Sequence, residues 1–163
     1  MHFCGWDMKR LALICCTLSL TACAARPTPV EVAALQAAKE TAQRNFARFP
    51  GLKTSIAASV KPATFRTPPL LSAHTIESSE ISELKFYSPY GDNTAISMRP
   101  FYCVRVHFAQ DVFNPFGAPT YYQVDVSQIA DRSLAMRVTW GERNVSPMCT
   151  NMKTQYQPFP ELR

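Results

Sequence analysis

Two histidines beyond residue 22, His74 and His107, are the side chains best suited to act as a catalytic base. A serine or cysteine hydrolase needs such a base beside a nucleophile and an orienting group. Neither histidine lies near a Gly-x-Ser-x-Gly sequence or a reactive-cysteine motif. We therefore expect a protein that is not an enzyme, and a small hydrolase is the least favoured alternative.

Acidic residues at positions 77, 80 and 83 are the other candidates for chemistry. Glycan cleavage requires two carboxylates that flank the scissile bond. These three glutamates lie three residues apart in a polar stretch, a spacing more typical of a solvated face. The sequence therefore predicts no glycosidase site.

Cofactor, metal and nucleic-acid binding also lack a motif. The four glycines beyond residue 22 form no phosphate-binding loop, and zinc needs more closely spaced ligands than the cysteines offer. The net charge is only +5, and the basic residues are scattered rather than interleaved with aromatic ones. We expect no cofactor, no metal ion and no nucleic-acid partner.

Residues 1–22 have the features of an export signal. Lys9 and Arg10 precede the uncharged apolar segment 11–22. A secretory signal has this order of charge and apolar residues, followed by small residues at the cleavage site. The segment is too short to span a membrane, which takes about 20 apolar residues. Because Met8 directly precedes the basic pair, it is an alternative start to Met1.

The sequence Leu20-Thr21-Ala22-Cys23 resembles the lipobox of bacterial lipoproteins. The resemblance implies cleavage before Cys23 and acylation of its thiol, and two or more acyl chains anchor a protein stably in a bilayer. Ala24 follows the cysteine instead of the aspartate that retains lipoproteins in the inner membrane. This implies the outer membrane, facing the periplasm, with surface exposure left open. An ordinary signal cleaved at small residues, or an uncleaved anchor, is the alternative.

The six cysteines reduce to one pair in the exported chain. Three of them lie in the signal and Cys23 is the lipid site, which leaves Cys103 and Cys149. Two remaining cysteines in a small exported domain usually form a disulfide. Two buried free thiols are the alternative.

A helix is predicted over residues 29–49. Thr28 can cap its first turn, Glu31 can complete a capping box, and Pro50-Gly51 ends it. Leu35, Ala38, Ala42, Phe46 and Phe49 form a thin apolar stripe that could lie on the domain. A stalk or partner helix is the alternative.

Alternating apolar residues predict three strands, over 102–108, 121–126 and 134–140, with a further short strand over 84–87. Joined by turns, they form an antiparallel meander whose apolar face needs a cover, for which we expect the 29–49 helix. Residues 61–76 are predicted to be irregular, after a short helix or strand near 55–60. The predicted class is α+β: a signal over 1–22, a lipidated tether over 23–27 and one domain over 28–163, β-rich over 82–141.

Two aromatic residues of a proline-containing loop, Phe113 and Phe116, are candidate partner-binding residues. Exposed aromatic loops often form protein interfaces, although both rings could instead fold back onto the core. The sequence thus favours a lipid-anchored envelope protein that binds a partner without catalysis. A module that binds the cell wall or a small ligand is the alternative.

Overall fold

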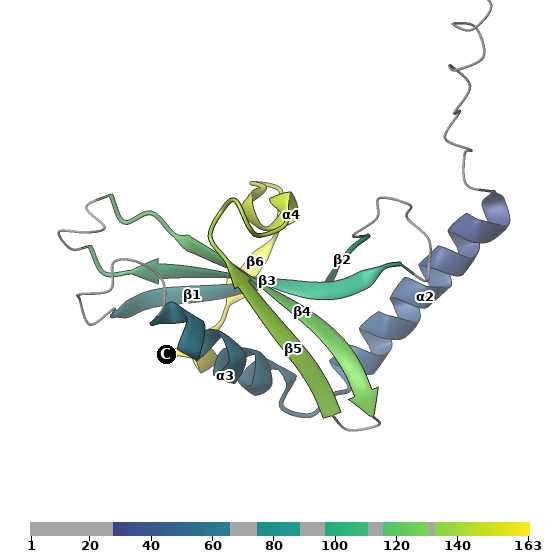
Figure 1. Cartoon of the computed structure of the whole chain (residues 1–163), viewed down its shortest axis with the longest axis horizontal. Coiled ribbons are helices and arrows are strands. Elements are labelled where there is room, and N and C mark those ends of the chain that lie inside the picture. Colours follow the sequence, from purple (N-terminus) through teal and green to yellow (C-terminus); the bar gives the residue numbers. More distant parts are fainter. Residues whose placement is uncertain (1–27, 66–74, 89–96, 111–115, 131–132) are drawn as a thin grey trace, which may run out of the picture.

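The computed structural model describes residues 28–65, 75–88, 97–110, 116–130 and 133–163, and these form helices followed by an antiparallel sheet (Figure 1). The helices α2 (Pro29–Ala47) and α3 (Leu52–Thr64) precede the strands. The strands are β1 (Ile76–Ser82), β2 (Lys85–Tyr87), β3 (Arg99–Phe108), β4 (Thr120–Ala130), β5 (Ser133–Trp140) and β6 (Tyr156–Pro158). The short helix α4 (Pro147–Thr150) precedes β6, and a 3-10 turn, η1 (Pro160–Leu162), follows it. The predicted α+β class is confirmed.

The sheet has the order β5-β4-β3-β1-β6, and β2 pairs with β3 off this path. The three strands predicted from alternation are β3, β4 and β5, which form the expected meander. The alternating apolar residues line the face of the main core, where Val104, Tyr122 and Val124 are fully buried. The short strand predicted over 84–87 is β2. Period-two alternation identified these strands because one face of each meets the core.

The helix that covers this face is α3, so the expectation that the 29–49 helix would cover it was wrong. Ile56 and Val60 of α3 are fully buried, whereas Phe46 is the one buried residue of α2. In Figure 1, α3 crosses the sheet while α2 extends away from it, with only its C-terminal end at the strands. Between Leu35 and Phe46 the stripe of α2 holds only alanines, and these bury too little apolar area to hold the whole helix against the sheet.

The predicted cap of α2 is confirmed. The Thr28 hydroxyl accepts a hydrogen bond from the Glu31 N–H at 3.3 Å, and the Glu31 carboxylate accepts one from the Thr28 N–H at 2.7 Å. These bonds favour the charged carboxylate and lower the pKa of Glu31. The helix ends at Ala47, two residues earlier than predicted. Among the helices within the described ranges, none is long and apolar enough to cross a membrane.

Two strands were not predicted, β1 and β6. The stretch from Ile76 to Ser82 is polar, yet β1 lies between β3 and β6. Two of its serines are buried and form hydrogen bonds with backbone groups. The Ser79 hydroxyl donates to the Phe159 carbonyl at 2.6 Å, and the Ser82 hydroxyl accepts from the Cys103 N–H at 2.9 Å. Buried serines of this kind satisfy backbone groups, so a polar sequence can occupy an interior strand.

Tyr102 of β3 predicts how stability changes in alkaline solution. Burial raises the pKa of its hydroxyl from 10.0 to about 12, since a buried phenolate loses its hydration. The folded state therefore holds this proton more tightly than the unfolded state. The stabilisation is complete below pH 10 and should be lost as the pH rises through 12. Urea unfolding midpoints between these pH values should fall less steeply for Tyr102→Phe, and equal slopes for the two proteins would contradict the assignment.

Candidate functional site

The strands β3 and β4 separate at one end of the sheet and leave a pocket between them, here called the β3–β4 fork. Their pairing ends at Phe101 and Asp125, whereas β4 continues to pair with β5 as far as Ala130 and Ser133. Pro100 has no N–H to extend the β3–β4 ladder, and β2 pairs with this part of β3 along its other edge. Figure 1 shows β3 diverging from the β4–β5 hairpin at this end.

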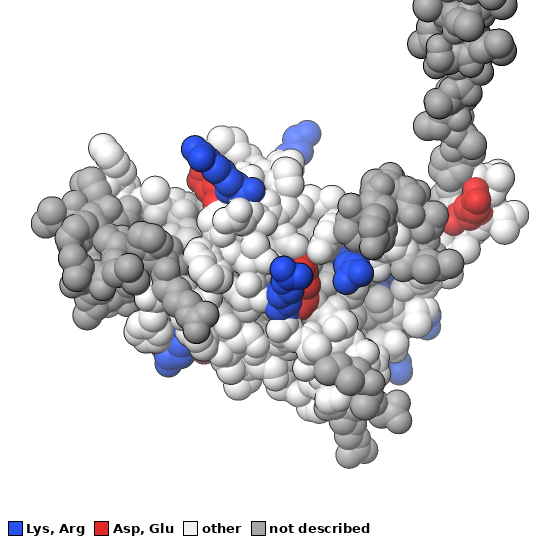
Figure 2. Space-filling model, viewed as in Figure 1, with Lys and Arg blue, Asp and Glu red and all other residues white. Residues whose placement is uncertain are grey.

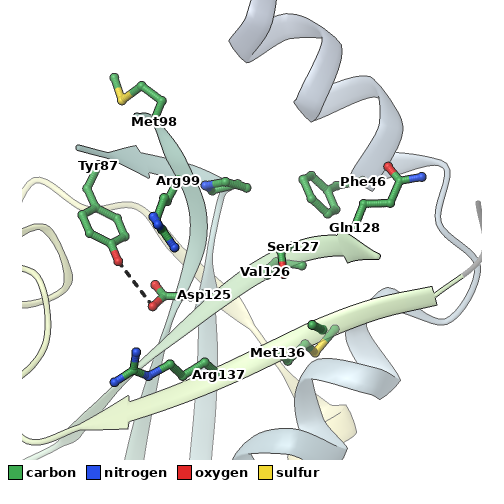
Figure 3. Close-up of a pocket in the computed structure, with 12 residues that line it drawn as sticks. Phe46, Tyr87, Met98, Arg99, Asp125, Val126, Ser127, Gln128, Met136 and Arg137 are labelled. Atoms are coloured by element: carbon green, nitrogen blue, oxygen red, sulfur yellow. Dashed lines mark hydrogen bonds between the residues drawn. The ribbon is translucent and has the colours of Figure 1, made fainter. Parts of the chain in front are cut away.

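The fork encloses a volume of about 560 Å³. Its walls come from the start of β3, the end of β4 and the start of β5, with one side chain each from α2 and β2 (Figure 3). The lining residues are Phe46, Tyr87, 98–100, 125–128 and 135–137. Segments that are far apart in the sequence therefore build this site together.

Asp125 carries the carboxylate of the fork, and neutral groups of the protein hydrogen-bond it. The Gln123 side-chain amide donates to one oxygen at 2.6 Å, and the Tyr87 hydroxyl lies 3.4 Å from the other. Gln123 is buried and its own oxygen accepts from the Ser146 N–H at 2.7 Å. This chain of bonds holds the Asp125 carboxylate in a defined orientation.

Two arginines, Arg99 and Arg137, lie on either side of Asp125 (Figure 3). Arg137 of β5 stands directly opposite Asp125 in the ladder. Both side chains are exposed, and neither forms an ion pair within 4.0 Å with a carboxylate of the described ranges. The fork therefore carries two guanidinium charges and one carboxylate, a net positive charge.

The pKa of the Tyr87 hydroxyl depends on these three charged groups. Burial raises the pKa of its hydroxyl, and the negative charge of Asp125 raises it further because a phenolate would be repelled there. The guanidinium groups of Arg99 and Arg137 partly oppose the effect. At neutral pH Tyr87 is thus a neutral hydrogen-bond donor to Asp125.

The opposite end of the fork is apolar. Phe46, the buried residue of α2, points toward β4 there, and Val126 and Met136 complete the surface (Figure 3).

No family model, curated protein or solved structure matches this chain. The chemistry of the fork is therefore inferred from its own residues, which combine unneutralised cations with an apolar wall. Nowhere in the described segments do three histidine, cysteine or acidic side chains gather as metal ligands.

A second polar cluster surrounds Glu80 on β1. Its carboxylate accepts a hydrogen bond from Arg105 Nε at 2.6 Å, and His107 Nε2 lies 3.9 Å from the same oxygen. The Arg105 guanidinium also stacks on the ring of Tyr156, 4.5 Å from its centroid. The hydrogen bond to Glu80 raises the pKa of Arg105. Glu77 and Glu83 are exposed, as a solvated face predicts, whereas Glu80 is half-buried and its carboxylate is paired with Arg105.

This Glu80 cluster has the features of a structural ion pair rather than a catalytic centre. Tyr156 closes it from the side of α4, and its hydroxyl donates to the Cys149 carbonyl at 2.6 Å. Burial raises the pKa of the Tyr156 hydroxyl. Within the described ranges, no hydroxyl or thiol forms a hydrogen bond with His107 that would make it a base for a nucleophile.

The disulfide predicted between Cys103 and Cys149 is confirmed, with an S–S distance of 2.08 Å. Both cysteines are buried and pack with Phe101 and Val145 in a small core on the face opposite α3. The bond joins the central strand β3 to α4. It therefore attaches the C-terminal segment to the sheet.

Phe116, another predicted site residue, does not line the fork. Phe116 is 90% exposed, so its ring does not fold back onto the core. Phe113, His74 and Cys23 lie outside the described residues. Sequence reasoning missed Asp125 and both arginines of the fork. Each is a single charged residue in an alternating strand, and only the register between strands brings them together.

Proposed function

We propose that this chain is an exported lipoprotein, anchored through acylated Cys23, whose domain binds a partner protein in the periplasm without catalysis. The sequence Leu20-Thr21-Ala22-Cys23 supports the anchor, and Ala24 supports the outer membrane. The disulfide between Cys103 and Cys149 supports export, since disulfides persist in oxidising compartments.

The β3–β4 fork is the observation that carries the binding role. It is a recessed surface with unneutralised cations at one end and an apolar wall at the other, as recognition sites commonly have. Figure 2 shows that charged side chains are few and scattered over the described part of this face. The described part of this face therefore offers no broad charged surface, and the local pocket is what supports the proposed binding role.

The anchor and the partner can be tested in one strain. Cys23→Ser should abolish labelling by a fatty-acid analogue and stop maturation cleavage, whereas Cys15→Ser, which changes a cysteine within the proposed signal, should leave labelling intact. Mild cross-linking in intact cells should then capture a specific envelope protein with the anchored form. Labelling that persists in Cys23→Ser would exclude Cys23 as the lipid site, and absence of any cross-linked partner would contradict the binding role.

A small-ligand or cell-wall binding module is the second candidate, because about 560 Å³ lies within the usual range of small-molecule pockets. Such a module should co-sediment with purified peptidoglycan in the absence of other proteins. Sedimentation without any cross-linked protein would favour this candidate over a protein adaptor.

A further inference from the structure

We propose that the β3–β4 fork binds an extended acidic segment of a partner protein, which adds to the edge of β4 that no described strand pairs with and places a carboxylate against the exposed guanidinium groups of Arg99 and Arg137. This inference rests on the proposed protein-binding function and names the chemistry of the partner. Three observations support it: the charges of the fork, the backbone groups of β4 that face the fork, and the alternation of side chains between the two faces of the sheet.

The charges of the fork favour an anion. Asp125 already accepts hydrogen bonds from Gln123 and Tyr87, and it forms no ion pair with Arg99 or Arg137. Within the described residues, neither exposed guanidinium group is paired with a carboxylate, so both can contact a ligand. Guanidinium groups bind carboxylates with paired, charge-assisted hydrogen bonds, which makes a carboxylate a suitable ligand for this pair.

The backbone of β4 favours an extended segment. Beyond Asp125, β4 pairs with β5 on one side only, over Val126 to Ala130. Because alternate residues of a strand direct their N–H and C=O groups to opposite sides, some of these groups face the fork. No described residue of β3 pairs with them. An extended peptide can satisfy such groups by adding a strand, as many peptide-binding domains allow.

The two faces of the fork define the pattern of the bound segment. Asp125 and Arg137 lie on the outer face of the sheet, whereas Val126 and Met136 lie on the inner face beside Phe46. Successive side chains of a strand point to opposite faces. A segment in the fork would therefore direct an acidic side chain to the arginines and its apolar neighbour to Met136, which is partly exposed beside the buried Phe46 and Val126. A small carboxylate would use only one of these two surfaces.

The test uses the full chain purified in detergent and a fluorescent, end-blocked pentapeptide that alternates valine and glutamate. Fluorescence anisotropy should detect binding that weakens with added salt. Arg99→Gln and Arg137→Gln should each weaken binding about tenfold, the loss expected for one charge-assisted contact. Arg143→Gln removes an exposed arginine outside the fork lining and should leave the affinity unchanged. Circular dichroism should show that all three variants remain folded.

A matched peptide with glutamine in place of glutamate should bind at least about tenfold more weakly. Equal binding of the two peptides, or equal binding by the double variant Arg99→Gln/Arg137→Gln, would overturn the proposal. Full displacement by octanoate at equal concentration would also overturn it in favour of a small anionic ligand. If the double variant still cross-links to its partner in cells, the protein-binding function stands and the fork is not the contact.

Discussion

Replacing both Cys103 and Cys149 with alanine is expected to lower the free energy of unfolding by about 4 kcal/mol. The bond joins residues 46 positions apart, so its removal frees a long loop in the unfolded chain. Alanine is the suitable replacement because both positions are fully buried and a serine hydroxyl would need a partner there. Urea unfolding at neutral pH, followed by circular dichroism, measures the change.

Reduction of the unmodified protein provides the control. Dithiothreitol should lower its unfolding midpoint toward that of the double alanine variant, whose own midpoint should not respond to the reductant. A double variant within about 0.5 kcal/mol of the unmodified protein would show that the bond adds little stability. The small core of Phe101 and Val145 would then hold α4 against β3 without it.

Phe159→Ala is expected to lower the free energy of unfolding by about 3–5 kcal/mol, the usual cost of removing a buried aromatic ring. The side chain is 0% exposed and belongs to the main core with Leu162. Its backbone is also bound to β1, since the Phe159 N–H donates to the Ser79 carbonyl at 2.8 Å. Loss of the ring would leave a cavity that this bound backbone cannot readily close. Thermal and urea unfolding both measure the effect.

Phe116→Ala is the matched control, because it removes the same side chain from a position that is 90% exposed. Its effect should stay within about 0.5 kcal/mol. If Phe159→Ala lowered the free energy of unfolding by no more than Phe116→Ala does, the C-terminal segment would not be part of the cooperative core. A large loss for Phe159→Ala alone would establish that the last residues of the chain stabilise the sheet.

Local patterns in the sequence were sufficient for several elements. The capping residues Thr28 and Glu31 act within one helical turn, and their prediction needed no tertiary contact. The alternation along β3, β4 and β5 indicated three strands with one buried face, and short connections between them indicated a meander. The disulfide followed from counting cysteines beyond the proposed lipid site, which itself stays a prediction.

Local patterns failed where a residue's role depends on a distant partner. The polar strand β1 became interior because Ser79 and Ser82 bind backbone groups of Phe159 and Cys103. Which helix covers the sheet depends on how many residues each can bury there: α3 buries five, among them Ile56 and Val60, whereas α2 buries only Phe46. Neither outcome is encoded in the spacing of residues within one segment.

The sequence by itself determined the cap of α2, the three strands of the meander and the cysteine pair, and it predicts the export signal and anchor. Each of these depends on residues close in the chain or on a simple count. Only the tertiary structure decided that α3 covers the sheet, that β1 and β6 extend it, and that β3 leaves β4 at Pro100. The fork exists because strand register and divergence bring Arg99, Asp125 and Arg137 together, and register is a property of paired strands rather than of any one strand.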